Sequence, residues 1–148
     1  MGLRYHPKVG SLVLADYSQG FVVPEMVKLR LAVVISPVIS ARQGLCTIVP
    51  LSTTAPERQM PYHYLLRIPF SLPRRWSKKE VWVKGDMVNA VGWHRLSLLS
   101  LGKDAGGKRQ YQTSVVAEMD LRKIRQCILH GLGMSVLTKN LSLDIDKS

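Results

Sequence analysis

The sequence contains few cysteines, few acidic residues and no long apolar run. Cys46 and Cys127 stand far apart, which excludes a disulfide scaffold or a cysteine-based zinc site and favours buried thiols in a reducing cytosol. No stretch approaches the ~20 apolar residues that a membrane-spanning helix needs, so we expect no membrane span. The first ten residues also lack the apolar run of a signal peptide, so we expect a cytoplasmic protein.

Familiar catalytic and cofactor motifs are missing as well. The chain has no Walker loop, no dinucleotide fingerprint and no Gly-x-Ser-x-Gly element. Its histidines are scattered, without the spacing of a metal site, so we expect no cofactor and no metal. They are His6, His63, His94 and His130.

The most informative feature that is present is positive charge. The 148 residues include 21 Lys or Arg against 10 Asp or Glu, for a net charge of +11. With 46% hydrophobic residues the chain can bury a core, and its length suits one domain. The charge favours a polyanionic partner without saying which one.

Short β-branched or aromatic runs bounded by glycine or proline fill the first two thirds of the chain, as is typical of strands. With no long helical pattern between them, they predict a mainly β (α+β) fold, a small twisted antiparallel sheet or barrel. The runs cover residues 11–16, 31–36, 45–51, 62–68, 80–84 and 87–91.

One strong helical pattern covers residues 115–130, where Leu121, Ile124, Cys127 and Ile128 form a single apolar stripe. Two glycines follow and end the predicted helix.

Three boundaries follow from the same patterns. We expect a single domain over residues 1–133, and a tail over residues 134–148 that frays. The polar, glycine-containing residues 103–113 predict a loop insertion.

Positive charge is concentrated between Glu57 and Lys84. This segment contains seven basic residues and two acidic ones, with Trp76 and Trp82 among them. Basic groups interleaved with aromatic rings suit nucleic acid, which offers phosphates to bind and bases to stack on. A solvated lysine-rich loop is the alternative. Trp82 by itself is more typical of a core or dimer contact than of base stacking.

A long loop, residues 18–28, joins the first two predicted strands. It carries Glu25 and brings Lys28 and Arg30 to the start of a strongly apolar strand. Function often concentrates in such loops. For Arg30 the alternative is an edge charge that keeps the strand soluble.

Five segments, in order along the chain, resemble sequence blocks of the MazF/PemK family of toxin–antitoxin ribonucleases. The resemblance covers about residues 4–130. The segments are residues 4–17, 25–37 (E-M-V-K-L-R-L-A-V-V-I-S-P), 49–53 (V-P-L-S-T), 61–63 (P-Y-H) and 83–88 (V-K-G-D-M-V) followed by Arg95-Leu96.

The resemblance implies an SH3-like barrel with a C-terminal helix, a homodimer, and inhibition by a cognate acidic antitoxin. It also implies a metal-independent endoribonuclease that cuts single-stranded RNA at short sequence motifs. The RNA's own 2′-hydroxyl would attack the adjacent phosphate, giving a cyclic phosphate and a 5′-hydroxyl. The protein would supply a base, an acid and groups that stabilise the developing charge.

The resemblance also assigns site residues. Arg30 takes the place of the essential loop arginine, whose planar guanidinium can hold two phosphate oxygens. Ser52 replaces a site threonine, with a turn-capping serine as the alternative. Asp86 takes the place of the base. Lys84 takes the place of the acid, on the same strand face if the strand continues, with an ordinary ion pair as the alternative. Glu25 could orient Arg30 or accept a proton.

We expect further contacts to RNA from the loop and the basic segment, with a structural role as the alternative for the histidine. These residues are Lys28, Arg58, His63, Arg67, Arg74 and Arg75.

Leu31 departs from the family pattern, which has proline there. Proline would fix the backbone beside Arg30, so leucine gives the loop more freedom. No histidine is present in residues 18–28. The departure leaves open a catalytically impaired member that only binds RNA, an antitoxin or DNA gyrase, the target of a toxin family that shares the fold.

Overall fold

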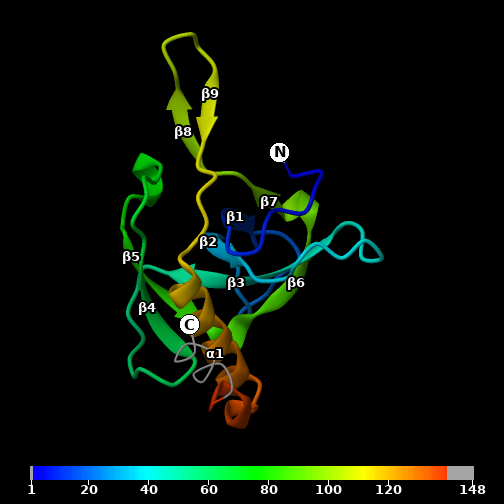
Figure 1. Cartoon of the computed structure of the whole chain (residues 1–148), viewed down its shortest axis with the longest axis vertical. Helices are drawn as coiled ribbons and strands as arrows, with labels where there is room; N and C mark the ends of the chain where they lie inside the picture. Colours follow the sequence, from blue (N-terminus) through cyan, green and yellow to red (C-terminus); the bar gives the residue numbers. More distant parts are fainter. Residues whose placement is uncertain (1, 140–148) are drawn as a thin grey trace.

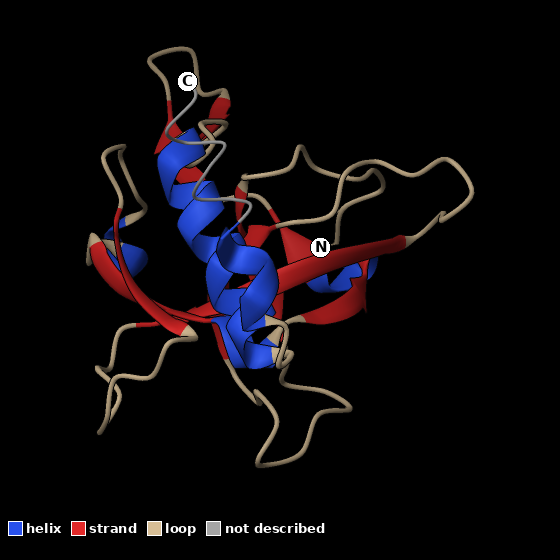
Figure 2. Ribbon diagram, turned by 60° about the horizontal axis from the view of Figure 1, so that its bottom comes forward, coloured by secondary structure: helices blue, strands red, loops and turns tan. Residues whose placement is uncertain are grey.

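The computed structural model describes residues 2–139, which form a twisted antiparallel sheet crossed by one long helix (Figures 1 and 2). The predicted mainly β fold is confirmed, with a sheet that is twisted and not closed. The strand order is β4-β5-β3-β2-β1-β7, and β6 also pairs with β3. The strands are β1 (Leu12–Asp16), β2 (Leu29–Val34), β3 (Leu45–Ser52), β4 (His63–Arg67), β5 (Glu80–Lys84), β6 (Asn89–Gly92) and β7 (Leu96–Ser97).

The central strand β2 is apolar on both sides because both of its faces are buried. Leu31 and Val33 belong to one core cluster, whereas Ala32 and Val34 belong to a second cluster on the opposite face. Side chains alternate between the faces of a strand, so a continuous apolar run covers both.

The long strand β3 connects two parts of the sheet. Its first half pairs with β6, its middle residues 48–50 pair with β2, and its last two residues pair with β5, as Leu51 with Val83 and Ser52 with Trp82. The end of β3 therefore lies where β2 and the β4–β5 pair diverge.

Helix α1 (Glu118–Gly131) buries Leu121, Ile124 and Cys127 against the first core cluster. The predicted apolar stripe is confirmed. The helix begins three residues later than expected because the preceding chain pairs with residues 10–11 instead, through a Val116 N–H···O=C Gly10 bond of 3.0 Å.

The C-terminal end of α1 packs closely against a 3₁₀ turn at Gly85–Met87. A Cβ atom at Gly131 would lie 2.9 Å from the Asp86 Cα, and one at Gly85 would lie 2.6 Å from the Cys127 carbonyl carbon. Glycine at both positions permits this approach, which sets where Asp86 stands.

One expectation about a chain segment needs correction. Residues 103–113 are not simply a loop, because β8 (Ser100–Lys103) and β9 (Arg109–Tyr111) form a hairpin that projects from the body (Figure 1). The Asp104 carboxylate accepts hydrogen bonds from the Gly106 and Lys108 N–H groups and closes a tight turn. In the expected tail, residues 135–137 form a 3₁₀ turn, and residues 140–148 lie outside the described residues.

Candidate functional site

Arg30 lies inside β2 and pairs with Ala15 of β1. Strand alternation places its side chain on the face of Ala32, which is the face of the second core cluster. Burial raises the pKa of Tyr17 on that face, and the charge of Arg30 acts in the opposite direction. The guanidinium therefore stands near the Tyr17 hydroxyl.

The Arg30 Nε–H is buried and has no hydrogen-bond partner among residues 2–139. Leaving a buried donor unsatisfied costs about 1–3 kcal/mol, and more for a charged group. Native structures satisfy nearly all such donors. An anionic oxygen from outside the chain would remove this cost.

Ser52 lies at the end of β3, on the same sheet face as Arg30. The β2–β3 ladder ends at Ala32 and Pro50, two residues before Arg30 and Ser52 would be opposite each other. The buried Ser52 hydroxyl accepts a hydrogen bond from the Thr54 N–H at 3.2 Å and donates to the Thr54 carbonyl at 3.3 Å. The turn-capping arrangement is thus present, beside Arg30.

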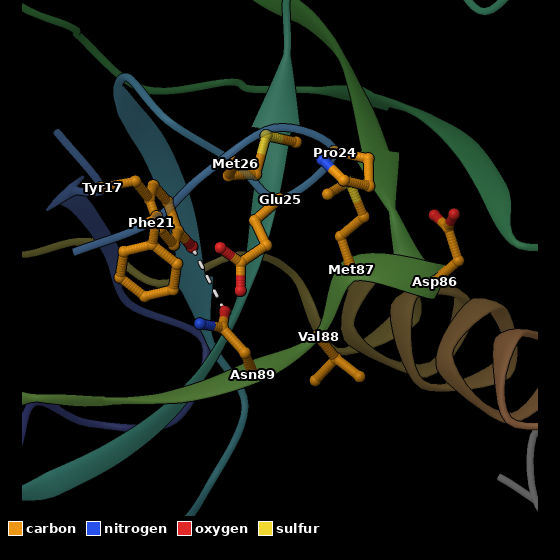
Figure 3. A pocket seen from close by; sticks show the side chains of 9 residues that line it. All are labelled: Tyr17, Phe21, Pro24, Glu25, Met26, Asp86, Met87, Val88 and Asn89. Atoms are coloured by element: carbon orange, nitrogen blue, oxygen red, sulfur yellow. Dashed lines mark hydrogen bonds between the residues drawn. The ribbon is translucent and has the colours of Figure 1, made fainter. Parts of the chain in front are cut away.

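A cavity of about 290 Å³ opens on this side of the molecule (Figure 3). Figure 3 shows the carboxylates of Glu25 and Asp86 well apart, with Asp86 at the end away from the aromatic rings. Glu25 Oε2 accepts a hydrogen bond from the Val22 N–H at 2.6 Å, which fixes its place in the loop. The lining residues are Tyr17, Phe21, Pro24, Glu25, Met26, Asp86, Met87, Val88 and Asn89.

Lys84 and Asp86 would share one strand face only if the strand continued past Lys84, and it does not. Strand β5 ends at Lys84, and the chain then turns at Gly85–Met87. Lys84 instead stands opposite His63 on β4. The cause is the glycine, which lets the chain turn against α1.

His63 is buried, and its Nδ1 accepts a hydrogen bond from the Met60 N–H at 3.0 Å. This bond assigns the proton of the neutral ring to Nε2. Burial lowers the pKa of His63, the Lys84 charge lowers it further, and Asp86 opposes both. The three groups are therefore electrostatically coupled at this end of β4 and β5.

The other expected RNA contacts are spread more widely. Lys28 lines a second cavity of about 270 Å³ together with Arg30, Thr53 and Thr54. Arg67 forms an exposed ion pair with Glu80, at 3.4 Å, at the end of β4 away from His63. Three further residues are exposed and line neither cavity: Arg58, Arg74 and Arg75.

Sequence reasoning missed Tyr17, Phe21 and Asn89 as cavity residues. The Tyr17 hydroxyl donates to Asn89 Oδ1 at 3.5 Å, and the two aromatic rings meet edge to face. Asn89 was detectable as the polar member of an apolar run. The two aromatic residues gave no comparable signal, because aromatic residues near a strand are ordinarily core.

Within residues 2–139, no cluster of three or more His, Cys, Asp or Glu side chains is arranged to hold a metal ion. None of the helices in that part of the chain has the length and apolarity needed to cross a membrane.

The structure is thus a small, mainly β protein: a twisted sheet with a C-terminal helix, a cavity lined by two carboxylates, and an arginine whose buried Nε–H has no partner among residues 2–139. Residues 8–130 match the family of PemK-like, MazF-like toxins of type II toxin–antitoxin systems. The chain belongs to this toxin family, as the sequence resemblance predicts.

Individual relatives are consistent with this assignment. An uncharacterized protein of Haemophilus influenzae is 30% identical over 108 residues, which cover 65% of this chain and 73% of that protein. MazF from Deinococcus radiodurans superposes with a TM-score of 0.60 at 22% identity, over 88% of this chain and 99% of that one. A mycobacterial endoribonuclease bound to its cognate antitoxin gives a TM-score of 0.54 at 19% identity, over 86% of this chain and 96% of that chain. These solved structures share the fold.

Proposed function

We propose that the protein is a toxin that cleaves single-stranded RNA at short sequence motifs, without a metal, and that a cognate acidic antitoxin neutralises it. The observation that carries the proposal is the buried Nε–H of Arg30, which has no partner among residues 2–139 of this member of the toxin family. A phosphate oxygen is the acceptor that a guanidinium fits best. The solved endoribonuclease and MazF structures with this fold support the choice of reaction.

In the proposed reaction the RNA 2′-hydroxyl attacks the neighbouring phosphate and releases a 5′-hydroxyl. Arg30 would stabilise the charge that develops on the phosphate, with help from the Ser52 hydroxyl. Asp86 or Glu25 would accept the 2′-hydroxyl proton, and Lys84 would protonate the leaving oxygen. Flanking nucleotides would be held by basic side chains and one histidine. These residues are Lys28, Arg58, Arg67, Arg74, Arg75 and His63.

The proposal includes a homodimer and a cytoplasmic location. The net charge of +11 is suited both to RNA and to an acidic antitoxin. Charge attraction of this kind accelerates association with either partner. An acidic antitoxin segment would then compete with RNA for the same positive face.

Leu31 bears on how active the toxin is. Its side chain is buried in the first core cluster, and it pairs with Leu14 in the β1–β2 ladder. The neighbouring Arg30 belongs to the same ladder, so hydrogen-bonded strands hold its backbone where family members use proline.

The proposal is tested by incubating the purified protein with single-stranded RNA and EDTA. We expect fragments that carry a 2′,3′-cyclic phosphate and a 5′-hydroxyl. Arg30→Ala should lower the cleavage rate about 100-fold or more, because one lost transition-state donor costs on that order. Arg109→Ala on the projecting hairpin, which removes the same charge elsewhere, should leave the rate unchanged.

Cleavage that stops on chelation would contradict the proposed mechanism. Intact RNA with retained RNA binding would instead identify a binding-only member of the family.

A further inference from the structure

An apolar patch lies on the face of β4 and β5 that is turned away from α1. Trp82 stands in the middle of β5, directly opposite Leu65 on β4 and Ser52 on β3. Residues opposite each other in antiparallel strands project from the same face. The flanking Val81 and Val83 point the other way, into the core cluster that α1 covers.

Trp82 is half-buried and, like Leu65, is absent from both core clusters of residues 2–139. The other two indoles differ. Trp76 packs on the first cluster, whereas Trp93 packs on the second and donates its ring N–H to the Leu45 carbonyl at 3.0 Å. Of the two roles expected for Trp82, a core contact and a dimer contact, the first does not hold, and its ring is left for a ligand or a partner.

Basic side chains occupy register positions on the same sheet face as this indole. Lys84 is two residues along β5, Arg67 is two residues beyond Leu65 on β4, and Arg30 shares the face through β2 and β3. One acidic residue, Glu80, lies on this face at the end of β5 away from Lys84, where it forms an ion pair with Arg67. An aromatic ring among cations matches single-stranded nucleic acid, which presents both base faces and phosphates.

A second copy of this chain fits the face less well. With a net charge of +11, two copies that met here would bring Lys84 and Arg30 of each chain together. Like charges that are brought together without partners oppose association. Charge complementarity therefore favours RNA over a second protomer as the occupant.

We propose that Trp82 is a stacking platform for a base of single-stranded RNA, beside the phosphate that Arg30 would hold. The inference rests on the proposed function for the identity of the ligand. Stacking accepts every base, because each has a π face. Trp82 would thus add affinity and place the strand without selecting the sequence.

The test uses short 2′-O-methyl oligoadenylate and oligouridylate, which lack the attacking hydroxyl and cannot be cleaved by the proposed route. We expect Trp82→Leu to weaken the binding of both oligonucleotides about tenfold, as measured by fluorescence anisotropy. Trp82→Phe keeps an aromatic face and should weaken binding less. Tyr111→Leu, which removes an exposed aromatic ring from the hairpin, should bind like the wild type. Thermal unfolding of each variant checks that it is folded.

The outcomes separate the platform from the proposed reaction. Oligonucleotide affinity that Trp82→Leu leaves unchanged would overturn the platform, even if the wild type cleaves RNA. A wild type that binds the oligonucleotides through Trp82 but leaves unmodified RNA intact would support the platform and contradict the proposed reaction. If Trp82→Leu dissociates a dimer in sedimentation while oligonucleotide affinity stays the same, the patch is a protomer interface and the inference fails.

Discussion

His63 is a buried histidine beside a lysine, and both features oppose its protonation. Its pKa is lowered from 6.5 in the folded chain, first by burial and then by Lys84, although Asp86 acts in the opposite direction. Below pH 6.5 the unfolded chain takes up this proton more readily than the folded chain does. The free energy of unfolding therefore decreases as the pH decreases. Above pH 6.5 the contribution is fully present.

The prediction is that His63→Gln flattens this dependence. The glutamine amide oxygen can still accept the Met60 N–H bond but takes up no proton in this range. Urea denaturation between pH 5 and 7 should show the wild type losing more stability than the variant as the pH falls. The exposed His94→Gln serves as the control and should follow the wild type. Parallel curves for wild type and His63→Gln would contradict the coupling.

The loop between β1 and β2 depends on an arginine from another part of the chain. Arg95 Nη1 donates to the carbonyls of Asp16 at 3.2 Å and Gln19 at 2.7 Å. Its guanidinium also lies 4.6 Å from the centre of the Phe21 ring, which lines the cavity with Glu25. Arg95 therefore holds the first half of the loop in place.

At this scale we predict that Arg95→Met loosens the loop while β1 and β2 remain formed. Two charge-assisted hydrogen bonds and one cation–π contact are lost, for about 1–2 kcal/mol of stability after allowance for solvent exposure. Hydrogen–deuterium exchange of residues 19–25 should accelerate, and thermal unfolding should report the loss. Arg109→Met, which replaces an arginine on the hairpin in the same way, is the control and should leave exchange of residues 19–25 as in the wild type. Unchanged exchange in the loop would show that Arg95 does not position it.

Across the whole molecule, the excess positive charge should make RNA binding strongly dependent on salt. Each phosphate contact to a single strand contributes about −0.7 to the slope of log K against log salt. Replacing both Arg67 and Lys84 by glutamine should therefore make the slope less steep by about 1.4. Titrations of the uncleavable oligonucleotides at several salt concentrations measure it.

The matched control removes the same charge from the hairpin, as Lys103→Gln with Lys108→Gln. Its slope should equal that of the wild type, since β8 and β9 form a hairpin that projects from the body of the molecule (Figure 1). If the salt slope decreases equally in the two double variants, the total charge governs RNA binding, and the position of the charges on the β4–β5 face does not.

Local patterns predicted the elements well because each pattern reflects burial along one segment. Both β2 and α1 can be predicted from their apolar residues. These residues form a continuous run in a strand that is buried on both faces, and a single stripe in a helix that is buried on one side. The hairpin at residues 100–111 was read as a loop over part of its length because its strands are short and exposed, with little apolar signal.

The relations between segments were harder to predict. Strand periodicity would place Lys84 and Asp86 on one face only if the strand continued, but the chain turns at Gly85–Met87 against α1. His63 became the neighbour of Lys84 through a cross-strand register that depends on both strands at once. A pattern within one segment contains no information about such a pairing.

The basic character, the mainly β class with a C-terminal helix and the membership in this toxin family follow from the sequence, because they depend on composition and collinear motifs. The packing of distant segments is what leaves the buried Arg30 Nε–H without a partner among residues 2–139 and keeps Trp82 out of both core clusters. Burial and strand register arise when distant segments pack together. The acidic cavity at Glu25 and Asp86 likewise exists only because α1 fixes the turn at Gly85–Met87 near the β1–β2 loop.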